Sequence, residues 1–498
     1  MNKFDIAIIG GGLGGLASGA LLAQRGKKVV LIEQHRRVGG CASAFQRFGC
    51  TIEASLHEID GLDENDIKTL YFKELDVFNH VDFLRLPELY FVCRGVNNFV
   101  FPTQKVHAIE KLKKHFPDEK NGIDKYFKLI SDLKEEVDFL SKFGFSAYYS
   151  NKYQNGNSML LKYSHLSIGQ YLDTIIQNEW LKLILLANIS YYHDDPYSLS
   201  LIYFSIAQES YYRGCWYIKG GSQRLSDYFV NIIKRNGGEV ITKHLVTNIL
   251  IEKNQAIGLK YASKNNLLQS STIFAQNIIS NTAFANMEKM LPPNVASCFM
   301  QNVKGFRESC SCVSIYLIFK QKLPKEIIGS QYSVIIYPEH INNLKNISAN
   351  NHYQDKIINF VYYSQVDSTL AAADKSVGVI TVTDYSFNWD NLTPNNYQQL
   401  KKDIAQLLIN RVSKTIPISN YIEKYEVATP KTIEKFTLNP KGSIYGFSQF
   451  PNQSGSYRPK NATAISNLYM ASAWTNPGGG FSGAIVSGLM CANEILNI

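Results

Sequence analysis

A glycine-rich turn between a buried strand and a helix constrains this chain more than any other feature. Residues 6–9 form the short continuous apolar run of a parallel strand that is covered on both faces. Gly10, Gly12 and Gly15 follow at the spacing GxGxxG, which provides a tight turn, a close approach of pyrophosphate to the backbone and close helix packing. The residues predicted to bind a dinucleotide at this helix N-terminus are Gly10, Gly12, Leu13, Gly14 and Gly15.

An acidic residue follows at the distance that a dinucleotide requires. Gly26 ends the helix, and residues 29–32 form a second buried strand that leads into Glu33, 18 residues after Gly15. At this offset a carboxylate accepts hydrogen bonds from ribose hydroxyls. A glycine motif alone is weak evidence, but strand, turn, helix, strand and acid occur here in order. Because an acid disfavours a 2′-phosphate, the sequence predicts FAD or NAD rather than NADP.

Length and composition exclude several other classes of protein. A chain of 498 residues is expected to hold two or three domains, at least one of them discontinuous. The formal charge of +9 is spread without a run of like charges, which argues against nucleic acid and permits only weak attraction to an anionic membrane. Eight cysteines without paired CxxC spacing indicate reduced thiols in a cytoplasmic setting, and no metal-site pattern is found.

Neither a signal peptide nor a membrane-spanning helix is expected. The first 30 residues already belong to the nucleotide-binding unit, so no cleavable segment is predicted before it. No uncharged apolar run reaches the roughly 18 residues that a spanning helix needs. Peripheral association with a membrane is left open, as is the oligomeric state.

A second glycine pair extends the motif. Glu33 begins the pattern E-x5-GG, which ends at Gly39 and Gly40, although a plain loop with a glycine turn would read the same way. GxGxxG followed by E-x5-GG resembles the FAD fingerprint of the flavin amine oxidase superfamily, and in particular its phytoene desaturase, carotenoid isomerase and retinol saturase-like family. Many members have Arg directly after the glycine pair, where this chain has Cys41. The resemblance implies that Gln34, Arg37, Gly39, Gly40 and Cys41 also contact FAD.

Two later blocks carry the same resemblance. The first has KGG before a helix, GG after it and a strand ending in Ser-Asn, and it implies that Val246 meets the adenine through its backbone. The second, near the C-terminus, reads NPGGGFSG, and its helix would direct partial positive charge at the flavin. It implies contacts from Gly480, Phe481 and Ser482. Many relatives have Asp or Glu where this chain has Ala473, a position that usually holds the ribityl chain.

The resemblance also implies an α/β fold with a discontinuous organisation. A Rossmann-like FAD-binding domain of the glutathione-reductase type is expected over 1–75, 216–300 and 435–498. A mixed-sheet substrate domain is expected over 76–105 and 301–434, with a lid-like helical subdomain over 106–215. In that subdomain, residues 180–189 form an apolar stretch that suits either a buried or an interfacial helix.

Aromatic residues are dense between Tyr191 and Tyr217, where they would form either core or the lining for a long apolar ligand. His57 is the titratable residue nominated for proton transfer near the flavin, with a purely structural histidine as the alternative. Glu53 occupies the usual acid position of the same stretch and is expected to fix the loop.

Three functions fit these observations. The favoured one is an FAD-dependent oxidoreductase or isomerase acting on a long apolar polyene or isoprenoid lipid, with NAD(P)H as a candidate external reductant. Desaturation, saturation and cis-trans isomerisation use the same flavin pocket and are not separated by the sequence. The alternatives are a flavin amine oxidase and a non-catalytic binding protein similar to the prenyl-protein escort factors. The intact GxGxxG with Glu33 argues against the last.

Overall fold

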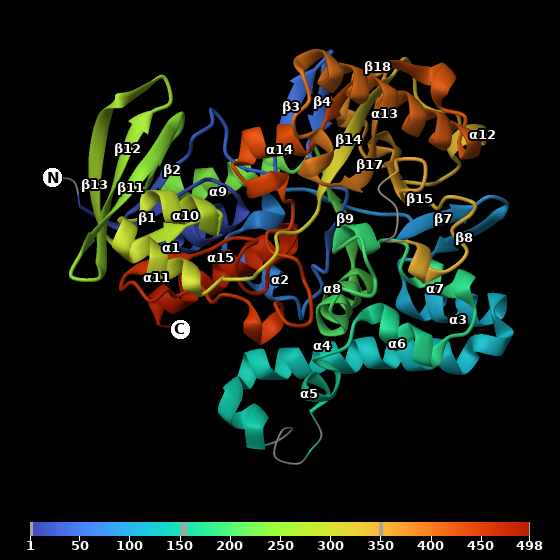
Figure 1. Cartoon of the computed structure of the whole chain (residues 1–498), viewed down its shortest axis with the longest axis horizontal. Coiled ribbons are helices and arrows are strands. Elements are labelled where there is room, and N and C mark those ends of the chain that lie inside the picture. Colours follow the sequence, from blue (N-terminus) through green and yellow to red (C-terminus); the bar gives the residue numbers. More distant parts are fainter. Residues whose placement is uncertain (1–2, 151–155, 157, 348–351, 498) are drawn as a thin grey trace.

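The first of two large sheets collects strands from the beginning, middle and end of the chain (Figure 1). The computed structural model describes residues 3–150, 156, 158–347 and 352–497. The strands of this sheet are β1 (Lys3–Ile9), β2 (Val29–Ile32), β10 (Glu239–Ile241), β11 (His244–Glu252), β12 (Gln255–Ser263), β13 (Asn266–Ser280) and β19 (Leu468–Met470). Their order is β10-β2-β1-β13-β12-β11, with β19 also paired to β13.

Strand β13 belongs to two kinds of pairing. Its first half runs antiparallel to β12, and with β11 these strands form the ribbon at the left of Figure 1. Its second half runs parallel to β1 and β19, with Ile279 opposite both Ile8 and Tyr469. The carboxyl ends of β1, β2, β13 and β19 therefore meet at one edge of the sheet, where open α/β sheets bind their ligands.

Helices cover both faces of β1, as its continuous apolar run requires. Ile6 and Ile8 pack in the cluster that contains residues of α1 (Leu13–Gln24), α9 (Gln223–Arg235) and α15 (Phe481–Leu496). Ala7 and Ile9 point the other way, into the cluster that contains α10 (Phe284–Met290) and α11 (Pro293–Gln301). Because a strand alternates its side chains, this division confirms that β1 is buried on both faces.

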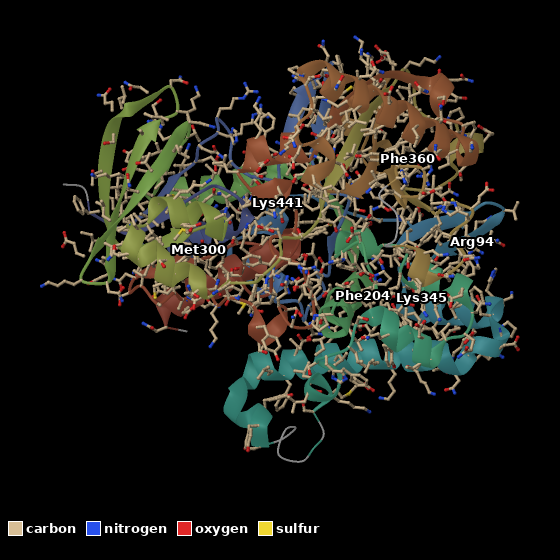
Figure 2. The ribbon with its side chains drawn as sticks, in the orientation of Figure 1. Arg94, Phe204, Met300, Lys345, Phe360 and Lys441 are labelled. Atoms are coloured by element: carbon tan, nitrogen blue, oxygen red, sulfur yellow. The ribbon has the colours of Figure 1, made fainter. Side chains whose placement is uncertain are left out.

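The second large sheet combines an early hairpin with much later strands. Its strands are β7 (Tyr90–Arg94), β8 (Asn97–Phe101), β14 (Ser311–Phe319), β15 (Ser333–Ile336), β16 (Ile358–Val361), β17 (Ser376–Asp384) and β18 (Ile422–Ala428). Their order is β18-β14-β17-β16-β15-β7-β8, and β15 with β7 is the parallel pair. α13 (Pro394–Thr415) covers one face in a cluster that includes Phe360, labelled in Figure 2.

Smaller elements join the two large sheets. β3 (Ala44–Arg47) and β4 (Cys50–Glu53) form a hairpin, and β9 (Cys215–Ile218) pairs with both β5 (Ile59–Asp60) and β6 (Phe83–Arg85). Short helices α2 (Ile67–Glu74), α12 (Lys325–Ile328) and α14 (Pro430–Thr437) complete these parts.

The helical segment lies along one side of the molecule (Figure 1). It contains α3 (Lys105–His115), α4 (Lys120–Tyr148), α5 (Met159–Tyr163), α6 (Ile168–Ile175), α7 (Glu179–Leu185) and α8 (Leu201–Arg213). Leu181 to Leu185 of α7 are buried, so the apolar stretch is a core helix rather than an interfacial one. Across the described residues, no helix is both long and apolar enough to cross a membrane. The α/β class is confirmed, whereas the domain boundaries remain a prediction.

Candidate functional site

A single continuous cavity of about 2390 Å³ reaches from the β1–α1 turn to the second sheet and to α8. Sites for one small molecule usually measure roughly 300–1,000 Å³, so this space suits an extended ligand together with a second one. We call its two walls the glycine end, formed by residues 9–13, 33–35 and 39–42, and the aromatic end, formed around Tyr191, Tyr203, Tyr211 and Tyr445.

Main-chain hydrogen bonds shape the glycine end. The Glu33 carboxylate accepts from the backbone N–H of Gly11 at 2.7 Å and from that of His35 at 2.8 Å. The N–H of Gly39 donates to the carbonyl of Gly11 at 2.6 Å, which ties the second glycine pair to the first turn. The carboxylate thus fixes the turn as well as facing the cavity.

Two glycines of the motif serve packing rather than lining. A Cβ on Gly14 would lie 2.2 Å from the carbonyl oxygen of Ala471, and one on Gly15 would lie 2.4 Å from that of Gly10. A Cβ on Gly488 of α15 would in turn lie 2.3 Å from the oxygen of Gly14. Helices α1 and α15 consequently approach each other at backbone distance, which only glycine permits.

Asn281, just after β13, bridges these segments. With its amide turned to match its neighbours, it accepts from Gly12 N and donates to the Ala471 carbonyl, both at 2.8 Å. The Ser-Asn ending marked a strand end in the sequence, but the bridging role depends on residues far apart in the chain.

The structure brings most of the predicted site residues to the cavity. Those lining it are Gly10, Gly12, Leu13, Glu33, Gln34, Gly39, Gly40, Cys41, His57, Val246, Ala473, Gly480, Phe481 and Ser482. Burial raises the pKa of the Cys41 thiol to about 11, so this residue stays uncharged at neutral pH.

Arg37 departs from the expectation. Its side chain is exposed, donates to the carbonyl of Ala44 at 3.2 Å and is absent from the described cavity lining.

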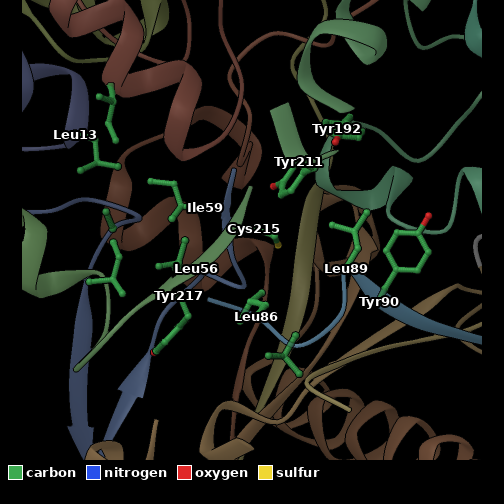
Figure 3. Close-up of a cluster of buried hydrophobic side chains, with 14 of the residues drawn as sticks. Leu13, Leu56, Ile59, Leu86, Leu89, Tyr90, Tyr192, Tyr211, Cys215 and Tyr217 are labelled. Carbon is green, nitrogen blue, oxygen red and sulfur yellow. The ribbon is translucent and has the colours of Figure 1, made fainter. Parts of the chain in front are cut away.

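Phenol rings dominate the aromatic end. Tyr192 and Tyr211 come from the segment before α8 and from α8 itself, and Figure 3 shows them near Cys215 of β9. Cys312 and Thr381 of the second sheet line the cavity as well. The aromatic cluster predicted from sequence is therefore both core and cavity lining.

His57 lies at this end in a dry environment. Burial lowers the pKa of its imidazole to about 4, so the ring is neutral at physiological pH. Its ring meets Tyr191 edge-on at 5.6 Å between centroids, and Nε2 lies 3.4 Å from Thr381 Oγ1. Glu53 accepts from the backbone of Ser55, Leu56 and Ser222, which fits the expected loop-fixing role.

A buried polar cluster lies where α15 begins. Ser482 Oγ donates to Asp60, and Lys68 Nζ lies 2.8 Å from Asp66 and 3.5 Å from Asp60. Burial alone would lower the pKa of Lys68, but the two carboxylates outweigh it and hold the pKa above the usual value. Sequence reasoning missed this cluster, because no motif links residues separated by more than 400 positions.

Arg458 is a second residue that sequence reasoning missed. It is buried, and its guanidinium donates to the carbonyls of Phe447 and Ala473 at 2.8 Å each and to that of Ser448 at 3.2 Å. Burial lowers its pKa to about 10. Because Ala473 lines the cavity, Arg458 positions main chain that borders the cavity.

Comparison with known proteins identifies the family to which this architecture belongs. Residues 13–496 match the family model described as flavin containing amine oxidoreductase. The chain is 26% identical to all-trans-retinol 13,14-reductase of Danio rerio, over 100% of this chain and 86% of that protein. It is 22% identical to a 4,4'-diapophytoene desaturase of a Methylomonas species, over 96% of this chain and 92% of that protein. Among solved structures, putrescine oxidase bound to putrescine matches with a TM-score of 0.65 and 13% identity, with all of both chains covered.

Proposed function

The chain belongs to the flavin containing amine oxidoreductase family, and from that premise we propose that it is an FAD-dependent oxidoreductase acting on a long apolar polyene lipid. The observation that carries the proposal is the cavity of about 2390 Å³, which continues past the glycine end to the phenol rings of Tyr191, Tyr203, Tyr211 and Tyr445. The retinol reductase and the desaturase, whose names specify polyene substrates, support the same choice.

The residues present fit FAD at the glycine end. Gly11, Gly12 and Gly40 line the cavity with backbone and Glu33 borders it, and a Cβ on Gly12 would lie 2.5 Å from the Asn281 side chain. At the other end, the first N–H groups of α15 lack partners within the helix and border the cavity at Phe481 and Ser482. Partial positive charge there suits the electron-rich edge of a reduced ring. Bound FAD would supply hydride chemistry, and the protein supplies position and exclusion of water.

The charges of the aromatic end favour an apolar substrate over an amine. His57 is neutral, and Asp60 is paired with Lys68. Glu58, next to His57, has a pKa that burial raises to about 8, so its carboxyl is neutral near pH 7. An ammonium group would therefore meet no free carboxylate at these three positions, whereas a polyene needs none.

Anaerobic stopped-flow spectroscopy tests the proposal. The purified protein is expected to show flavin absorbance, and after photoreduction its flavin should be reoxidised by retinoid or carotenoid polyenes. Reoxidation by a polyene indicates a reductase, reduction of the oxidised flavin by a more saturated lipid indicates a desaturase, and cis-trans change without net oxidation indicates an isomerase. Bleaching by putrescine with release of peroxide would favour an amine oxidase instead. Protein without flavin absorbance that gains no thermal stability from FAD would contradict the proposal.

We also propose peripheral contact with a membrane at one opening of the cavity. Ile67 and Leu70 of α2 and Leu161 of α5 border the cavity and expose 39%, 63% and 52% of their surfaces. In a sedimentation assay the wild type should pellet with anionic vesicles, whereas the variant Leu70→Asp should remain in the supernatant.

NAD(P)H is proposed as the external reductant, and anaerobic bleaching of the flavin by NADH or NADPH tests that choice.

A further inference from the structure

A buried carboxyl group in the cavity wall has no part in the architecture described so far. Glu58 lines the cavity with 5% of its surface exposed. Its Oε2 accepts a hydrogen bond from Cys215 Sγ at 3.3 Å, whereas Oε1 is buried and makes no hydrogen bond of normal geometry within the described part of the chain. Leaving such an atom unpartnered costs about 1–3 kcal/mol, so its presence at a cavity points to a role with a bound ligand.

The surroundings of Glu58 favour its neutral form. Burial raises its pKa to about 8, Glu88 and Asp60 add to the rise, and Cys215 with the nearby Tyr191 offsets part of it. The remaining groups that face it are phenols whose own pKa values burial raises, on Tyr90, Tyr192, Tyr211, Tyr332 and Tyr363. None of these groups is a cation. The adjacent His57 is neutral and holds no acidic proton at pH 7.

We propose that Glu58 is the proton donor of this site, an inference that rests on the proposed polyene chemistry. In the reducing direction, bound reduced flavin would supply a hydride to one carbon of a double bond. The O–H bond of Glu58 breaks as a C–H bond forms at the neighbouring carbon. The double bond becomes single with the two electrons that the flavin would supply, and the carboxylate left on Glu58 takes its next proton from water. In the desaturating direction the same carboxylate removes the proton.

The test compares Glu58→Gln with a matched variant, Glu88→Gln, in flavin-loaded protein. Glutamine keeps the size and an acceptor oxygen but has no acidic proton. Glu88 is also a buried carboxyl whose pKa burial raises, to about 7, yet it accepts from the backbone of Tyr332 and is absent from the described cavity lining. Removing it therefore controls for the loss of a buried acid.

Infrared spectroscopy reads the proton directly. The wild type should show a carbonyl band of a protonated carboxylic acid that shifts in D2O and titrates with a midpoint near pH 8. This band should vanish in Glu58→Gln and persist in Glu88→Gln. Polyene turnover should fall about 10²–10⁴-fold in Glu58→Gln and less than about threefold in Glu88→Gln. Turnover of the wild type should decline above about pH 8, and product made in D2O should carry solvent deuterium at one carbon.

Two results would overturn the proposal, and they are distinguishable. If the wild type and Glu58→Gln reduce polyenes at the same rate and with the same pH profile, Glu58 is not the proton donor. The proposed function would then remain intact. If the wild type binds flavin but does not react with polyenes in either direction, both the role of Glu58 and the proposed function are contradicted. Unchanged flavin absorbance and thermal stabilisation by FAD in Glu58→Gln would show that lost turnover is not lost folding.

Discussion

The two ends of the cavity are constructed from different parts of the polypeptide. At the glycine end the wall is largely main chain, and the adjoining Gly14, which serves packing, leaves no room for a single methyl group. At the aromatic end the wall is side chains, and burial sets the protonation of His57 and Glu58. A binding surface made of backbone tolerates no substitution, whereas a surface made of side chains can change its chemistry one residue at a time.

Substitution at Gly14 should have the largest effect, because Gly14 packs backbone against backbone. Gly14→Ala would place a Cβ 2.2 Å from the carbonyl oxygen of Ala471, which cannot move without displacing β19 from α1. We expect a loss of unfolding free energy of about 3–5 kcal/mol and loss of bound flavin. Urea denaturation and flavin content measure both. Gly26→Asn is the control, since a Cβ at Gly26 meets no atom within 4 Å and Asn tolerates a positive φ; equal losses in both variants would contradict the packing argument.

Glu58 should show the next largest effect, in the pH dependence of stability. Its pKa is about 8 when folded against 4.5 as a free side chain. The stabilisation is complete below pH 4.5 and is lost as the pH rises through 8, because the unfolded chain ionises first. Between pH 5 and pH 9 the wild type should therefore lose about 3–4 kcal/mol more than Glu58→Gln. Urea titrations at both pH values measure this difference, and the exposed Glu252→Gln should leave it unchanged.

Arg458 combines the two cases, because its side chain positions main chain by donating hydrogen bonds to backbone carbonyls. Arg458→Met would leave the carbonyls of Phe447, Ser448 and Ala473 without their donor. We expect a loss of about 2–3 kcal/mol and weaker flavin binding. Arg458→Lys keeps the charge but not the fork of donors, so it should recover only part of the loss. Full recovery by lysine would show that charge, rather than geometry, positions the Ala473 segment.

Arg37 should show the smallest effect. Its guanidinium donates to Ala44 and lies outside the described cavity lining, so Arg37→Ala should change the flavin dissociation constant less than about twofold and stability by less than about 0.5 kcal/mol. Equilibrium titration with FAD measures the constant. A tenfold weakening would restore Arg37 as the replacement for the arginine missing at position 41.

The same contrast explains what could be predicted. Gly10, Gly12 and Glu33 were identifiable because a backbone-lined phosphate site requires glycine at fixed spacing, and that requirement leaves a pattern in one short segment. Glu58 and Arg458 left no such pattern. Their importance depends on burial and on partners supplied by other elements, such as Cys215 beside Glu58. The direction of the Arg37 side chain was not predictable for a related reason, because sequence proximity to Glu33 does not determine which side of a loop a long side chain takes.

The backbone contact between α1 and α15 also has a consequence for how the protein is made. Gly488 is synthesised 474 residues after its partner Gly14. At roughly 5–20 residues per second, the interval lasts about 25–100 seconds. Throughout that time the glycine turn lacks the helix that packs against it. The packing of α1 against α15 can therefore form only after this interval has passed.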